Sequence, residues 1–158
     1  MKKTNAQKFS REFEIYVLEY LKDNYNITDV DFSRLTPPTG DGGYDGAIYW
    51  VKVGLDESIH ETLFEAKLRS TLGYALPMND FSKALIIAVN RFSDELYIAT
   101  NITFSPETLR QLKIFSSRTG IVVKTLNGKA LYEWYKKTSL NNRLQFENNF
   151  IDFLKKSE

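Results

Sequence analysis

The sequence predicts an α/β domain in which a mixed sheet is flanked by helices. Segments with helical spacing alternate along the chain with short segments rich in β-branched and aromatic residues, and two of the latter stand close enough to pair as a hairpin. The expected order of elements is α-β-β-β-α-β-α-β-α-α. With 158 residues, 42% of them hydrophobic, the chain is long enough for one sizeable core and too short for two.

The first half of the chain is expected to hold a helix followed by three strands. Apolar residues fall on one arc at helical spacing over residues 6–22, which predicts an amphipathic helix. Residues 27–35 (ITDVDFSRL) alternate as a short strand does. The segments AIYWVKV and ETLFEAKL are predicted to be strands, and the polar loop GLDESIH between them predicts a hairpin.

The second half is expected to alternate helices and strands. Asn79 and Asp80 are candidate caps for a helix over FSKALIIAVN, and ELYIATNI has the composition of a buried strand. Ser105 followed by Pro and Glu opens a helix that Gly120 closes. A strand, IVVKTL, then leads into an expected turn at residues 127–128, and helices are predicted over LYEWYKK and over residues 142–156.

The segments TGDGGYDGAIYW and LFEAKLR carry the candidate chemistry. Asp45 stands at the mouth of a strand, where neighbouring glycines let the backbone turn tightly and approach a ligand. The two-residue period of a strand puts Glu65 and Lys67 on one face. If the hairpin pairs as expected, Asp45 and Glu65 converge as two oxygen ligands for Mg²⁺, with an ammonium beside them. Such a set suits phosphodiester hydrolysis.

Two acids raise competing interpretations. Asp41 shares the glycine loop, but Asp45 is preferred as the ligand because it directly enters a strand. Glu14 lies inside the apolar arc of the first helix, between Leu18 and Leu21, where a carboxylate needs a partner. A pairing with a nearby Lys or Arg would satisfy it.

These motifs together resemble the catalytic domain of Mrr-type restriction endonucleases, a branch of the PD-(D/E)xK nuclease superfamily. The resemblance runs from the pair Phe13-Glu14 to about Tyr135, and the segments ATNITFSPETLRQL and IVVKTLNGKALYEWY follow the family's order of elements. Many family members have Gln where this chain has Glu65, and LRSTLGYALPMND has no obvious counterpart in the family.

The resemblance implies both a fold and roles for particular residues. The fold is restriction-endonuclease-like, with an α-β-β-β-α-β core and an extra α-β-α. Asp45 and Glu65 are then metal ligands, Lys67 is the catalytic lysine, and Glu14 is an outer carboxylate of the metal site. The implied domain spans residues 1–138, and residues 139–158 form a C-terminal helix that could join a domain absent from this chain.

The expected function is a Mg²⁺-dependent endonuclease of double-stranded DNA, with Mn²⁺ as a substitute ion. Family analogy places it as the nuclease effector of a restriction or anti-phage defence system. One alternative is a Holliday-junction resolvase or repair nuclease, which would normally require a stable dimer and a basic face. Another is a non-catalytic module that binds nucleic acid or protein, which should have lost at least one of the three key residues.

The amino-acid composition excludes some kinds of site and bears on where the protein acts and how it reaches DNA. The chain has no cysteine and one histidine, which excludes a disulfide framework and a thiolate metal site. No apolar run approaches the roughly 18 residues of a membrane span and no signal-peptide core is present, so a cytoplasmic protein without membrane contact is expected. A net charge of +1 is low for a strong DNA binder. Homo-oligomerisation or an attached delivery domain is therefore expected to bring it to DNA.

Overall fold

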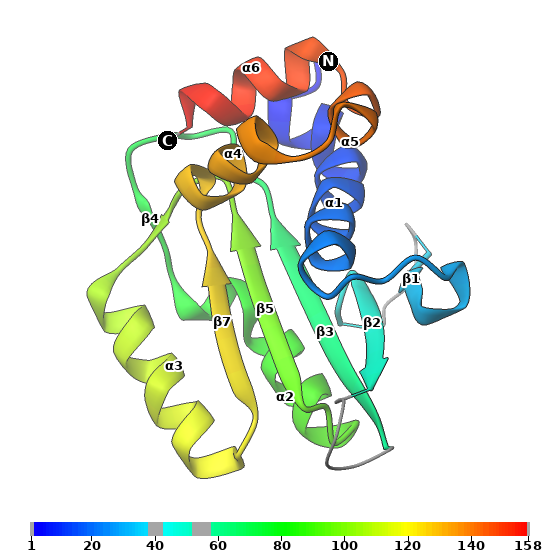
Figure 1. The fold of residues 1–158 in the computed structure, drawn as a ribbon. Coiled ribbons are helices and arrows are strands. Elements are labelled where there is room, and N and C mark those ends of the chain that lie inside the picture. Colours follow the sequence, from blue (N-terminus) through cyan, green and yellow to red (C-terminus); the bar gives the residue numbers. More distant parts are fainter. Residues whose placement is uncertain (1, 38–42, 52–57, 158) are drawn as a thin grey trace.

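The protein is described by a computed structural model over residues 2–37, 43–51 and 58–157. In this part of the chain a five-stranded sheet has the order β1-β2-β3-β5-β7 (Figure 1). Its strands are β1 (Ser33–Leu35), β2 (Gly46–Val51), β3 (Ile59–Lys67), β5 (Glu95–Thr100) and β7 (Val122–Leu126). The β1–β2 and β2–β3 pairs are antiparallel, whereas β3–β5 and β5–β7 are parallel. The predicted mixed sheet and the predicted hairpin are thus confirmed.

Helices cover both faces of this sheet because its inner strands alternate between two apolar clusters. On one face, side chains such as Ile48 and Phe64 pack against α1 (Asn5–Asn24), α4 (Gly128–Lys137) and α6 (Asn148–Lys156). On the other face, Ala47 and Leu63 pack against α2 (Ser82–Asn90) and α3 (Pro106–Thr119). Figure 1 shows α1 and α2 on opposite sides of the sheet. A small parallel pair, β4 (Ala75–Leu76) and β6 (Thr103–Phe104), lies outside it.

The strand predicted over residues 27–35 is mostly wrong. Only Ser33–Leu35 is extended, and Val30–Phe32 forms a 3₁₀ turn. The side chain of Asp29 accepts a hydrogen bond from the backbone N–H of Asp31 at 2.9 Å. Such a local bond competes with the strand ladder, which the apolar alternation alone could not reveal.

Some of the predicted helix ends are confirmed and others are wrong. Ser105 caps α3 and Gly120 ends it in a left-handed conformation with φ 78°, as predicted. The predicted caps Asn79 and Asp80 are wrong, because residues 78–81 form a 3₁₀ turn that runs into α2, and α2 shows no side-chain cap among the described residues. The expected turn after β7 is instead the start of α4, where Asn127 accepts from the N–H of Ala130 at 2.9 Å.

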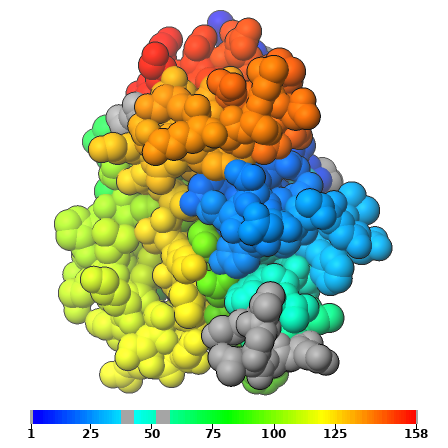
Figure 2. Space-filling view, viewed as in Figure 1, coloured from blue at the N-terminus to red at the C-terminus, as the bar shows by residue number. Residues whose placement is uncertain are grey.

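The C-terminal segment folds as two helices, α5 (Leu140–Leu144) and α6, where one was predicted. Figure 2 shows this segment, orange to red, gathered over one end of the molecule beside α1 in blue. The apolar residues that α6 buries there are Phe150, Ile151, Phe153 and Leu154. These residues belong to the same core as α1, and the attachment of a further domain stays a prediction. Of the helices described, none is long and apolar enough to cross a membrane.

Candidate active site

The β2–β3 hairpin brings Asp45 and Glu65 to the same cavity. The antiparallel ladder ends at the pair of Gly46 with Phe64, and Asp45 and Glu65 are the next residues beyond that pair on the two chain segments. The backbone of Asp45 is held on both sides, since its N–H donates to the Phe64 carbonyl at 2.9 Å and its carbonyl accepts from the Thr36 N–H at 2.8 Å. The two carboxylates therefore line one cavity, which is the convergence that the sequence predicted.

Packing requires the glycines on both sides of Asp45. A Cβ on Gly46 would overlap the Phe64 ring and stand 2.7 Å from the Arg34 carbonyl oxygen. Gly43 has φ +76°, and its Cβ would meet Ile87 of α2 at 2.8 Å. The glycines let the loop lie against β1, β3 and α2, and their part in the approach of a ligand stays a prediction. Asp41 and Gly42 lie outside the described residues.

The side chains of Asp45 and Lys67 are oriented by short polar contacts. Asp45 Oδ2 accepts a hydrogen bond from the Ala66 N–H at 2.7 Å. Lys67 Nζ lies 2.8 Å from Glu65 Oε1 in an ion pair between residues two apart on β3. Glu65 and Lys67 thus share a face, as strand periodicity required.

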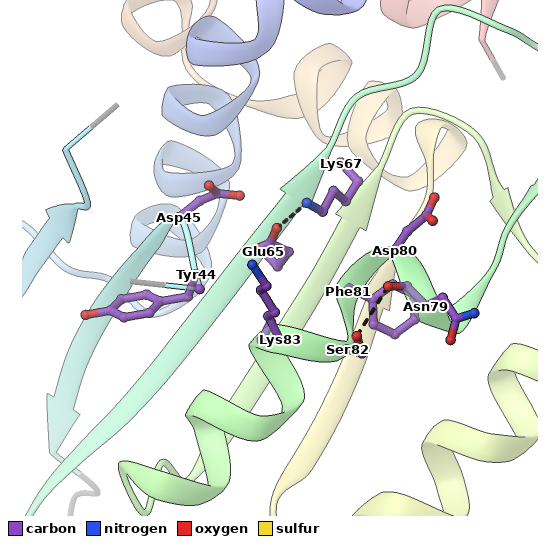
Figure 3. A pocket seen from close by; sticks show the side chains of 11 residues that line it. Tyr44, Asp45, Glu65, Lys67, Asn79, Asp80, Phe81, Ser82 and Lys83 are labelled. Atoms are coloured by element: carbon purple, nitrogen blue, oxygen red, sulfur yellow. Dashed lines mark hydrogen bonds and ion pairs between the residues drawn. The ribbon is translucent and has the colours of Figure 1, made fainter. Parts of the chain in front are cut away.

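A cavity of about 400 Å³ opens in front of these three side chains. Figure 3 shows the hairpin residues on one side of it and the start of α2 on the other. Its lining consists of Gly43, Tyr44, Asp45, Glu65, Lys67, Asn79, Asp80, Phe81, Ser82, Lys83 and Ala84. The cavity is therefore polar on the hairpin side, and its far side is formed by the end of the segment without a family counterpart, Asn79 and Asp80, and by the residues that follow it.

Burial raises the pKa of both carboxyls of the site. The pKa of Glu65 is raised to about 7, first by burial and then by the charge of Asp45, although Lys67 acts in the opposite direction. Burial also raises the pKa of Asp45, against the lowering effects of the Ala66 N–H and of Lys67. Carboxyls whose pKa is raised by burial in a cavity are frequent at functional sites.

Glu14 approaches the pair from α1 and does not line the cavity. Its Oε2 lies 2.8 Å from Arg11 Nη1, and Arg11 also donates to the Thr36 carbonyl at 2.9 Å. This is the pairing with a basic residue that the sequence left open. The pKa of Glu14 is raised mainly by burial and further by the charge of Asp45, while Arg11 acts in the opposite direction. The charge of Glu14 in turn helps to raise the pKa of Glu65.

The donor set fits a hard cation with few protein ligands. Among the described residues no three Asp, Glu, His or Cys side chains group as a metal site. Mg²⁺, however, is commonly held by one or two carboxylates, with water and substrate phosphates completing an octahedron. Asp45 and Glu65, which line the same cavity, meet that smaller requirement.

Sequence reasoning missed several residues that shape the cavity. The Tyr44 hydroxyl accepts from Arg34 Nη2 at 2.6 Å, and its ring centroid lies 5.4 Å from the guanidinium carbon of Arg91. These contacts anchor the residue next to Asp45. Asp80 and Lys83 enter from the opposite wall, and no motif marks them, because their position depends on where α2 packs.

Comparisons with known proteins bear on the fold. No family model matches the chain, and no curated protein matches it. Among solved structures, the chain is similar to the MspJI restriction endonuclease in complex with a 27-mer oligonucleotide, with a TM-score of 0.58 and 18% identity. The match covers 94% of this chain and 32% of the other, so the chain spans about a third of that protein's length. This likeness shows a restriction-endonuclease-like fold.

Proposed function

We propose that this chain is a Mg²⁺-dependent DNA endonuclease domain, with Asp45 and Glu65 as metal ligands and Lys67 as the catalytic lysine. The observation that carries the proposal is the convergence of these three side chains on one cavity from the two strands of a hairpin. A turn and a surface ion pair without function would not require the buried Glu65 to share a cavity with a second acid at a cost in desolvation.

The residues present can perform phosphodiester hydrolysis together. When bound by Asp45 and Glu65, Mg²⁺ supplies the charge that polarises the phosphate and activates a water molecule. Lys67 is held 2.8 Å from Glu65, so its ammonium is placed to hold the attacking water or to offset charge that develops on the phosphate. Asp45 is kept in orientation by the Ala66 N–H.

Double-stranded DNA is the proposed substrate. The proposal is supported by the likeness of the fold to a restriction endonuclease solved with an oligonucleotide, and by the Mrr-type resemblance of the motifs. An effector role in restriction or anti-phage defence follows from that resemblance alone. Because the chain is nearly neutral, delivery by a homo-oligomer or an attached domain is part of the proposal.

The test is cleavage of supercoiled plasmid by the purified chain in Mg²⁺, in Mn²⁺ and in EDTA. Nicked or linear product is expected with either ion and none in EDTA. A double variant, Asp45→Asn with Glu65→Gln, prepared identically, controls for contaminating nucleases. Absence of product with both ions, or equal product from the double variant, would overturn the proposal.

A further inference from the structure

Lys83 brings a positive charge to the cavity from the wall opposite the hairpin. It lies in the first turn of α2, is exposed and lines the cavity that Asp45, Glu65 and Lys67 line. Figure 3 shows its side chain extending from α2 toward Glu65. Its ammonium thus faces the space in which a substrate of the proposed site would lie.

The other cations around the site are already paired with carboxylates. Lys67 is paired with Glu65 at 2.8 Å, and Arg69 with Asp80 at 2.7 Å. Arg11 is paired with Glu14 at 2.8 Å.

Lys83 differs from these cations in its contacts. Across residues 2–37, 43–51 and 58–157 it has neither an ion pair nor a side-chain hydrogen bond. A lysine with a purely structural role would be expected to hold a carboxylate or to cover apolar surface with its stem. Its charge is instead available to an anion that enters the cavity.

Packing fixes where Lys83 stands relative to Asp45. The loop glycine Gly43 lies so close to α2 that an added Cβ would come within 2.8 Å of Ile87 and 3.7 Å of the Lys83 Cβ. On the inner side of the same turn, Phe81 and Ala84 are buried in the core. The two walls of the cavity are therefore held together, and Lys83 is not carried on an independent loop.

We infer that Lys83 binds a phosphate of the nucleic-acid substrate at the active site, an inference that rests on the proposed function. A phosphodiester adds negative charge to a cavity that already holds the carboxylates of Asp45 and Glu65. An unpaired ammonium opposite them offsets that charge and holds the strand against the metal-binding side. Lysine suits this role because it acts as a compact charge on a flexible stem.

The inference is tested with Lys83→Gln, Lys83→Arg and a matched control, Lys113→Gln, which removes an exposed lysine on α3 outside the cavity lining. Binding of each protein to a fluorescent DNA duplex is measured by anisotropy in EDTA over a series of salt concentrations. Loss of one phosphate contact lowers the slope of log K against log salt by about 0.9. Plasmid cleavage in Mg²⁺ gives kcat/KM in parallel.

Lys83→Gln is expected to lower the salt slope by about one and kcat/KM by about tenfold, because a charge-assisted contact is lost. Lys83→Arg should stay near wild type in the salt slope, and Lys113→Gln should match wild type in both measurements. Thermal unfolding of Lys83→Gln should match wild type, and a variant that fails to fold would show a structural role and overturn the inference.

The outcomes separate this inference from the proposed function. If wild type binds and cleaves DNA while Lys83→Gln keeps the full slope and rate, Lys83 is not a phosphate contact and the nuclease proposal stands. If wild type neither binds nor cleaves, the nuclease proposal fails and this inference fails with it.

Discussion

Asp45 and Glu65 lie next to the Gly46–Phe64 pair that ends the β2–β3 ladder, and both line the same cavity. Burial of Glu65 and the negative charge of Asp45 both oppose ionisation of Glu65, whose pKa is raised to about 7. A fold keeps such a pair at a cost in free energy, which a bound cation would offset.

Removal of any of the three site residues should abolish cleavage without loss of the fold. Asp45→Asn, Glu65→Gln and Lys67→Gln are each expected to lower the rate by at least about 100-fold, since each removes a ligand or a charge used in the reaction. Plasmid nicking measures the rate and circular dichroism the fold. Glu107→Gln, at an exposed acid on α3, is the control. Nicking at the wild-type rate by one of the three would remove that residue from the mechanism.

Glu14 should tune the metal site from outside. Because the charges of Glu14 and Asp45 act on each other, Glu14→Gln is expected to raise the Mg²⁺ concentration needed for half-maximal cleavage by roughly tenfold. Arg11→Gln breaks the same ion pair but leaves the Glu14 carboxylate in place, so its Mg²⁺ requirement should not rise. Equal Mg²⁺ requirements in Glu14→Gln and wild type would reduce Glu14 to a structural partner of Arg11.

Glu65→Gln should stabilise the metal-free protein at high pH. The folded chain holds the Glu65 proton more tightly than the unfolded chain, because the folded pKa of about 7 exceeds the ordinary value of 4.5. This contribution to stability is complete below pH 4.5 and is lost as pH rises through 7. The variant should therefore gain on wild type by on the order of 3 kcal/mol at pH 8 relative to pH 4.5.

Urea unfolding in EDTA at these two pH values measures that gain. Asp152→Asn, at an exposed acid of α6 outside the cavity lining, is the control, and its difference from wild type should be much the same at both pH values. A difference between Glu65→Gln and wild type that is independent of pH would show that Glu65 ionises as freely in the folded chain as in the unfolded one.

Gly46→Ala should destabilise the hairpin and impair the site. Its Cβ would overlap the Phe64 ring and stand 2.7 Å from the Arg34 carbonyl, so a cost of about 2–3 kcal/mol is expected. Gly120→Ala, where no described atom lies within 4 Å, carries only the strain of a left-handed residue, about 1 kcal/mol. Chemical denaturation compares the two. Equal losses would mean that the ring of Phe64 moves aside.

The isolated chain should bind duplex DNA weakly. With a net charge of +1 it has little electrostatic attraction to a polyanion, and a dissociation constant above about 1 µM is expected at physiological salt. Anisotropy in EDTA measures it, and sedimentation at the same concentration reports the oligomeric state. Nanomolar binding by a monomer would contradict the proposal that an oligomer or an attached domain delivers the nuclease.

The sequence by itself determined the features that depend on local period and local hydrogen bonds. Strand alternation put Glu65 and Lys67 on one face, and the Ser105 cap and the Gly120 stop marked both ends of α3. These features follow from backbone geometry within a few residues, so they can be read without knowledge of the fold.

Only the tertiary structure decided how distant segments meet. It showed that Gly46 is required by the ring of Phe64, that Glu14 pairs with Arg11 within reach of the charge of Asp45, and that Lys83 enters the cavity from α2. Each of these contacts joins segments whose approach is set by side-chain packing across the sheet, and no periodicity in the chain encodes it. The pattern of residues could therefore predict the hairpin half of the site, whereas the opposite wall depended on where α2 packs.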